Sequence, residues 1–154
     1  MSYLLLKWLH IISSTVLLGT GAGIAFFMWR AHRTRDARVI AAVAADVVRA
    51  DLLFTATAVV AQPVTGLLLL SKLGYPWTSH WIHWSLLLYV LVGCCWLPVV
   101  WLQLQMRNLA RTAAAAGDPL PELYHRYFRY WFLLGWPAFA GVLLVFWLMV
   151  AKPA

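Results

Sequence analysis

Three of the five histidines are spaced so that they could ligate a metal or a haem. His10 lies inside the apolar run "LLLKWLHIIS", residues 4–13, at a depth where an imidazole is unusual. His80 and His83 are three residues apart, which puts them on one face of a helix. An ionisable side chain inside a membrane segment is costly and marks a functional site by default, and imidazole is a common axial ligand of haem iron. The residues therefore favour a haem held by His10 and His83, with His80 as the alternative second ligand and Lys7 as the ion-pair partner of a propionate.

The same three histidines could instead bind copper or zinc, because imidazole suits both ions. Such sites normally add a carboxylate or a thiolate, and the acids all fall on the opposite side of the predicted topology: Asp36, Asp46, Asp51, Asp118 and Glu122. Aromatic residues near the three histidines could wall a macrocycle, although aromatic belts at membrane interfaces need no cofactor. A third interpretation is a non-enzymatic structural or accessory subunit with packed or interfacial histidines. His32 and His125 lie beside arginines and are interpreted as solvated or headgroup-facing.

Membrane-spanning helices must position these side chains. The chain has 154 residues, of which 64% are hydrophobic and 11% charged. A helical span needs about 20 apolar residues, and the sequence predicts four: about 3–29, 52–70, 81–104 and 127–150. Residues 36–51 predict an amphipathic lead-in continuous with the second span. The fold class is therefore an all-α, polytopic membrane four-helix bundle forming one domain over 1–154, whose first apolar run is too long for a cleavable signal.

Two further features mainly concern packing. Gln62 precedes Pro63, and its amide could bind a ligand but is expected to cap the carbonyl that the proline kink leaves free. The stretch "GTGAG", residues 19–23, contains a G-x-x-x-G motif that lets a helix approach closely, either within the bundle or across a homodimer.

The orientation follows from the positive charges near the span ends. Nine arginines lie in or beside the first-to-second and third-to-fourth connections, whereas the other side has only Lys7, Lys72 and Lys152. The positive-inside rule then places both termini and the loop after residue 72 on the outer, periplasmic side of a bacterial inner membrane. Topology and anionic lipid headgroups account for the net charge of +7, so a nucleic-acid partner is not expected.

Four segments resemble a family of predicted integral membrane proteins, domain of unknown function 2269. They are "LLKWLHIISS", "AQPVTGLLLL", "WIHWSLLLYVLVGCCWLPVVWLQLQ" and "YWFLLGWPAFAGVLLVFWLMVAKP", and together they extend over nearly the whole chain. The resemblance implies a small four-helix membrane protein whose first helix carries a histidine. It brings no established activity.

A more distant similarity is to the HemJ-type protoporphyrinogen oxidase, a four-helix haem b membrane protein. That family begins with a comparable K-x-L-H-I-I and opens its third helix with W-L-H-x-K, which match Lys7, His10, Trp81 and His83. The family's lysine falls on Ser85, and this departure argues against the oxidase activity. The resemblance implies that His10 is a haem ligand.

Together these observations predict a haem b-binding membrane protein with a redox role near the periplasmic face. Its electron partner could be a quinone, superoxide or a porphyrin-like substrate, among which the sequence does not choose. The sequence leaves open whether the protein is an enzyme.

Overall fold

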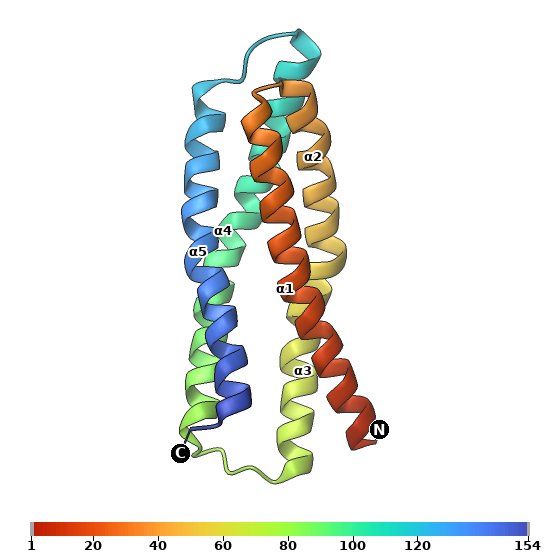
Figure 1. The fold of residues 1–154 in the computed structure, drawn as a ribbon, viewed down its shortest axis with the longest axis vertical. Coiled ribbons are helices and arrows are strands. Elements are labelled where there is room, and N and C mark those ends of the chain that lie inside the picture. The colour runs from red at the N-terminus through yellow and green to blue at the C-terminus, as the bar shows by residue number, and fades with distance from the viewer. Residues whose placement is uncertain (1, 154) are drawn as a thin grey trace.

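The computed structural model describes residues 2–153, and all its regular elements are helices. In chain order they are α1 (Tyr3–Thr34), α2 (Ala37–Ala50), the π-helix η1 (Asp51–Thr55), α3 (Ala56–Leu73), α4 (His80–Ala116) and α5 (Glu122–Ala151). The beginning of α1, the end of α5 and the connection 74–79 lie at one end of the elongated bundle, here called the terminal end (Figure 1). The short connections 35–36 and 117–121 lie at the other, the arginine-rich end.

Four helical segments are long and apolar enough to cross a membrane, which confirms the predicted number. They are Tyr3–Thr34, Ala37–Leu73, His80–Ala116 and Glu122–Ala151. Each helix runs past its expected span, mainly at the arginine-rich end. α4, with 37 residues, measures about 56 Å at 1.5 Å per residue. Because the hydrocarbon core is about 30 Å thick, the helices extend well into water or headgroups.

The helix ends explain why the connections are shorter than the sequence suggested. Gly74 and Gly117 have φ of 65° and 72°, the left-handed conformation that ends α3 and α4 at little cost. The alanines 113–116, which lie beyond the third expected span, continue α4 because alanine is the best helix former. At the other connection, the Asp36 carboxylate accepts a hydrogen bond from the backbone N–H of Arg38 and begins α2.

The second membrane segment is continuous, as expected, but contains an unexpected wide turn. The π-helix η1 joins α2 to α3, and the N–H of Ala56 donates to the carbonyl of Asp51 five residues back. Such π-helical turns are rare inside α-helices and frequent at functional sites.

The buried apolar core lies toward the arginine-rich end, where α1, α2, α4 and α5 meet. Its largest members include Met28, Ile40, Met106, Tyr124 and Trp131. Toward the terminal end the helices form two pairs, α1 with α3 and α4 with α5 (Figure 1). The Tyr89 hydroxyl, which donates to the Val59 carbonyl, links α4 to α3. The bundle is therefore packed more completely at one end than at the other.

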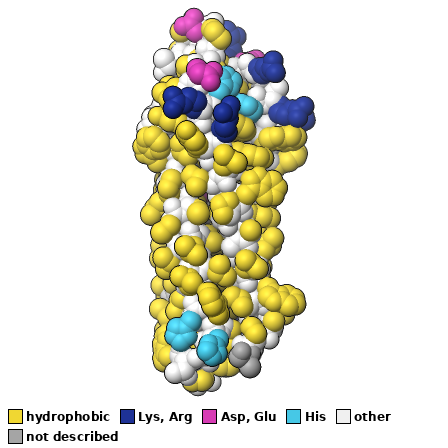
Figure 2. Space-filling view, turned by 90° about the vertical axis from the view of Figure 1, so that its left-hand side faces the viewer, with side chains coloured by type: hydrophobic (Ala, Val, Ile, Leu, Met, Phe, Trp, Pro, Cys, Tyr) yellow, Lys and Arg dark blue, Asp and Glu magenta, His cyan; other side chains and the backbone are white. Residues whose placement is uncertain are grey.

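The surface is hydrophobic along most of its length, and its charged side chains gather toward the arginine-rich end. Figure 2 shows a broad hydrophobic band, with Lys, Arg, Asp and Glu side chains at the upper, arginine-rich end of that face and histidines near both ends. Many large apolar side chains in this band are exposed, as lipid-facing side chains are.

The glycines of "GTGAG" do not pack within the chain. A Cβ at Gly19, Gly21 or Gly23 would meet no neighbouring atom of the described residues within 4 Å. Packing within the bundle, one of the two expected roles of the motif, is therefore wrong for this chain.

Candidate functional site

His10 is held against α3 by a hydrogen bond that fixes its tautomer. Its Nδ1 lies 2.8 Å from the Thr65 hydroxyl oxygen. That hydroxyl is 2.6 Å from the carbonyl oxygen of Ala61, a distance that requires the hydroxyl proton to lie between the two oxygens. Thr65 therefore donates to Ala61 and accepts from His10, so Nδ1 carries the ring proton. The other ring nitrogen, Nε2, is left with a lone pair, which is the form that binds metals.

The backbone of the same histidine is held by Gln62. The Gln62 amide nitrogen donates to the His10 carbonyl at 2.8 Å and to the Ser13 hydroxyl at 2.6 Å. The expectation that this amide caps the carbonyl freed at Pro63 is wrong, because its donors are used between helices. Sequence reasoning missed both Gln62 and Thr65 as partners of His10.

Gly66 lets the imidazole lie close to the backbone of α3. A Cβ at this position would lie 3.3 Å from Cε1 of His10, tighter than ordinary van der Waals contact. The segment "QPVTG" thus supplies an amide, a hydroxyl and a bare backbone, at residues 62, 65 and 66, to one histidine of α1. The four-residue spacing that places 62 and 66 on one helical face was the available signal.

The other two histidines of the expected haem site lie elsewhere at the terminal end. His80 and His83 are exposed in the first turn of α4, and neither forms a hydrogen bond among the described residues. Figure 1 shows the beginning of α4 and the beginning of α1 on opposite sides of this end. No hydrogen bond or ring contact joins either histidine to His10. Lys7 is exposed, with Nζ 5.8 Å from the centre of the Tyr3 ring.

The three-histidine arrangement needed for copper or zinc is not assembled. Residues 2–153 contain no group of three or more His, Cys, Asp or Glu that could hold a metal ion. Ser85, at the position of the HemJ-type lysine, is buried and donates to the Trp81 carbonyl at 2.7 Å. Its hydroxyl is thus satisfied within α4.

A second polar cluster surrounds Asp51, the last residue of the expected amphipathic lead-in. This carboxylate is only 3% exposed. The Trp96 indole N–H donates to its carboxylate at 3.3 Å. In the orientation its neighbours favour, the Gln103 amide donates to the other carboxylate oxygen at 3.2 Å and accepts from Trp131 at 3.3 Å.

The Asp51 cluster joins three helical segments at the level of the π-helix. Its members come from η1, α4 and α5, so the carboxylate connects elements that are distant in sequence. The hydroxyl of Thr55, at the other end of η1, is buried without a hydrogen-bond partner among the described residues. The sequence carried a signal for this pairing that was missed. Asp51 and Gln103 each lie a few residues further from the arginine-rich end than an arginine, Arg49 and Arg107 respectively, which places the two side chains at similar depth.

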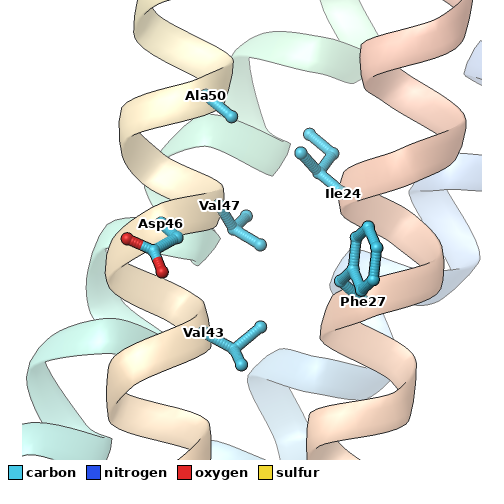
Figure 3. Close-up of a pocket in the computed structure, with 6 residues that line it drawn as sticks. All are labelled: Ile24, Phe27, Val43, Asp46, Val47 and Ala50. Carbon is cyan, nitrogen blue, oxygen red and sulfur yellow. The ribbon is translucent and has the colours of Figure 1, made fainter.

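Two cavities lie toward the arginine-rich end. The larger, about 640 Å³, is lined by His32, Arg33, Arg35 and His125. The smaller, about 270 Å³, lies between α1 and α2 and is mostly apolar (Figure 3). Its lining residues are Ile24, Phe27, Val43, Asp46, Val47 and Ala50. Asp46 forms an exposed ion pair with Arg49 at 3.0 Å.

Comparison with known proteins identifies the family and nothing finer. No curated protein and no solved structure matches the chain. A matching family model covers the helices that carry His10, the Gln62–Gly66 segment and the Asp51 cluster. Over residues 4–153 the chain matches the family of predicted integral membrane proteins called DUF2269, and it belongs to that family.

Proposed function

We propose that this membrane protein binds haem b through His10 and serves in electron transfer at its terminal end. The observation that carries the proposal is the Nδ1–H···Oγ1 hydrogen bond from His10 to Thr65. Metal-ligating histidines almost always donate their other ring N–H to an oxygen, which fixes the tautomer and makes the ligating nitrogen more basic. His10 meets this condition inside a membrane-length helix.

The residues around His10 suit an axial ligand. Gln62 holds its backbone and Gly66 leaves room for its ring, so both the position and the orientation of the imidazole are set by α3. When bound, haem b would supply one-electron oxidation and reduction. The role of the chain is then to orient the iron ligand and keep its Nε2 unprotonated.

For the second axial ligand we propose His83, with His80 as the alternative. Because α1 and α4 begin on opposite sides of the terminal end, this pairing requires the two helix ends to approach each other when haem binds (Figure 1). Both side chains are exposed and free of hydrogen bonds among the described residues, so their ring nitrogens are available. Lys7, one turn before His10, is proposed to meet a propionate. The electron partner is proposed to be a quinone or superoxide. A porphyrin-like substrate is less favoured, because Ser85 stands where the related oxidase has lysine.

A second candidate function is supported by the same contacts. The ring Nδ1 and the carbonyl of His10 both join α1 to α3. This use suits a structural or accessory membrane subunit in which His10 fastens two helices and binds no cofactor.

One experiment distinguishes these candidates. The full chain is produced in haem-replete bacteria, purified in detergent and examined by absorption spectroscopy, pyridine haemochrome assay and iron analysis. A bound haem b gives a Soret band that shifts on reduction with dithionite. His10→Ala should abolish or alter this spectrum, whereas the control His125→Ala, at the opposite end, should leave it unchanged. A colourless, iron-free preparation, or a spectrum that His10→Ala leaves intact, would overturn the proposal and favour the accessory role.

The second ligand is tested in the same preparations. His83→Ala should shift the spectrum from a low-spin, two-histidine form to a high-spin form, and His80→Ala should not. The reverse result would assign the position to His80.

A further inference from the structure

We propose that the cavity at the arginine-rich end is a binding site for a phosphate-bearing anion. This cavity, here called the basic cavity, has a volume of about 640 Å³ and is lined by His32, Arg33, Arg35 and His125. All four side chains are hydrogen-bond donors when protonated, and the two arginines are always charged. The inference is independent of any haem at His10, because the two sites lie at opposite ends of the bundle.

The positive charge of the basic cavity is not neutralised by an ion pair within residues 2–153. Among residues 2–153 the ion pair between side chains is that of Arg49 with Asp46, neither of which lines this cavity. The Asp36 carboxylate is engaged by the backbone N–H of Arg38. Asp118 and Glu122, the acids nearest to the start of α5, form no ion pair with Arg33 or Arg35. Two guanidinium groups therefore share one cavity without a carboxylate partner.

The wall of the basic cavity is built before any ligand arrives. The His32 ring stacks on Phe128 with centroids 3.6 Å apart and an interplanar angle of 4°. Its Nδ1 lies 3.3 Å from the Tyr124 hydroxyl, which leaves Nε2 as its remaining polar atom. His125 meets the His32 ring edge-on at 5.8 Å. The His32 imidazole is thus held against the first turns of α5, which also carry His125.

The two arginines are also positioned. The Arg33 guanidinium lies 5.3 Å over the Trp29 ring, a cation–π contact that holds it near the helix surface. Arg35 has φ of 56° and ends α1 by donating its backbone N–H to the His32 carbonyl at 3.3 Å. A non-glycine residue rarely adopts this conformation, so the tight connection to α2 fixes where the Arg35 side chain starts.

The donor set selects phosphate by its chemistry. Guanidinium groups bind phosphate oxygens through paired, charge-assisted hydrogen bonds, and imidazole N–H groups can add a further donor. An anionic lipid headgroup and a soluble phosphate share this chemistry. Basic pockets between membrane helices are known to bind lipid headgroups in this way.

The test uses the full chain, purified in detergent and stripped of lipid, with two probes. Inorganic phosphate is titrated by calorimetry. Phosphatidylglycerol, with phosphatidylcholine as the zwitterionic comparison, is titrated by native mass spectrometry. We expect at least one anionic probe to bind, and the double variant Arg33→Gln/Arg35→Gln to weaken binding by about tenfold or more.

The matched control removes the same charge outside the cavity. Arg38→Gln/Arg111→Gln alters two exposed arginines of the same end that do not line the cavity, and should change binding by less than about twofold. If the arginine pair of the cavity prevents folding, His125→Gln takes its place, with weaker binding expected. Phosphatidylglycerol bound alone identifies a headgroup site, and inorganic phosphate bound alone identifies a soluble ligand. Binding of neither probe, or equal weakening by the two double variants, would overturn the proposal.

Discussion

At the scale of single residues, the best-defined feature is the pairing of His10 with Thr65. The Thr65 hydroxyl donates a hydrogen bond to the Ala61 carbonyl and accepts one from the imidazole, so Thr65 determines which ring nitrogen of His10 is protonated. Replacing either partner tests a different consequence. Removing His10 tests ligation itself, and changing Thr65 tests whether the tautomer matters.

Thr65→Val keeps the size of the side chain and removes the hydroxyl. Nδ1 then loses its acceptor, and we expect haem affinity to fall by about 10- to 100-fold, the usual effect of losing such a partner. Thr65→Ser restores a hydroxyl and should recover most of the affinity. Haem titration of the stripped protein, followed at the Soret band, measures both. Equal affinities for Val and Ser variants would show that the hydroxyl has no part in ligation.

Loss of the buried Asp51 carboxylate should destabilise the bundle. Asp51→Ala leaves the N–H groups of Trp96 and Gln103 without their acceptor, at about 1–3 kcal/mol for each unsatisfied buried group. Asp51→Asn keeps one acceptor and should lie between alanine and wild type. The free energy of unfolding is measured by denaturant titration in detergent, with tryptophan fluorescence as the signal.

Asp46→Ala is the matched control, because this acid lies on the same helical segment in an exposed ion pair. Exposed pairs contribute about 0–1 kcal/mol, so the control should stay close to wild type. If the Asp51 and Asp46 variants unfolded with equal free energies, the buried cluster would not be holding the helices together.

The histidines could be found from the sequence, and their partners could not. Imidazoles inside apolar runs stand out by composition, which is why His10 was a candidate. Thr65 and Gln62 look like ordinary polar residues of a membrane helix until the pairing of α1 with α3 is known. The burial of Asp51 could not be predicted for a related reason: an acid at the start of an apolar run has the same pattern whether it is solvated or buried between helices.

At the scale of elements, Gly141 of α5 lies against Val92 of α4. A Cβ on Gly141 would lie 2.5 Å from Cγ2 of Val92, too close for a valine to accept without shifting. We expect Gly141→Ala to reduce the free energy of unfolding by about 1–3 kcal/mol through overpacking.

Gly93, on α4, is the control for this substitution. A Cβ there would meet nothing within 4 Å, so Gly93→Ala should be neutral or slightly stabilising through helix propensity. Detergent melting curves of the two variants make the comparison. A Gly141→Ala variant as stable as Gly93→Ala would mean that the helix pair adjusts freely.

Hydropathy predicted the number of membrane-length segments because a run of about twenty apolar residues is unfavourable in water and favourable in a bilayer. It did not predict how far the helices continue beyond the bilayer. Those continuations are amphipathic, and their stability comes from the core around Met106 and Tyr124, which is formed by contacts between distant segments. The π-helical turn was also invisible, since it changes hydrogen bonding without changing composition.

At the scale of the whole molecule, charge is distributed along the long axis. The basic cavity and nearly all the arginines occupy one end, and His10, His80 and His83 occupy the other. The two proposed sites therefore face different sides of the membrane. The free surface of Gly19, Gly21 and Gly23 leaves room for a second copy, so the homodimer remains a prediction.

The orientation itself is a testable prediction. Nine arginines against three lysines predict that the terminal end lies on the periplasmic side. A C-terminal alkaline phosphatase fusion should be active and a C-terminal green fluorescent protein fusion dark, because the first folds only in the periplasm and the second only in the cytoplasm. The opposite pair of results would reverse the topology and move the histidines to the cytoplasmic side.

The π-helix determines how α3 is rotated about the helix axis relative to α2. One residue added to or removed from a helix rotates everything after it by about 100° and shifts it by about 1.5 Å. Deleting Leu53, an exposed residue of η1, should convert the wide turn to regular α-helix and carry Gln62, Thr65 and Gly66 away from His10. The chain would keep its hydropathy and its four spans, yet lose the hydrogen bond that defines the imidazole. The extra residue in the turn of η1 thus allows α2 and α3 to face different neighbouring helices.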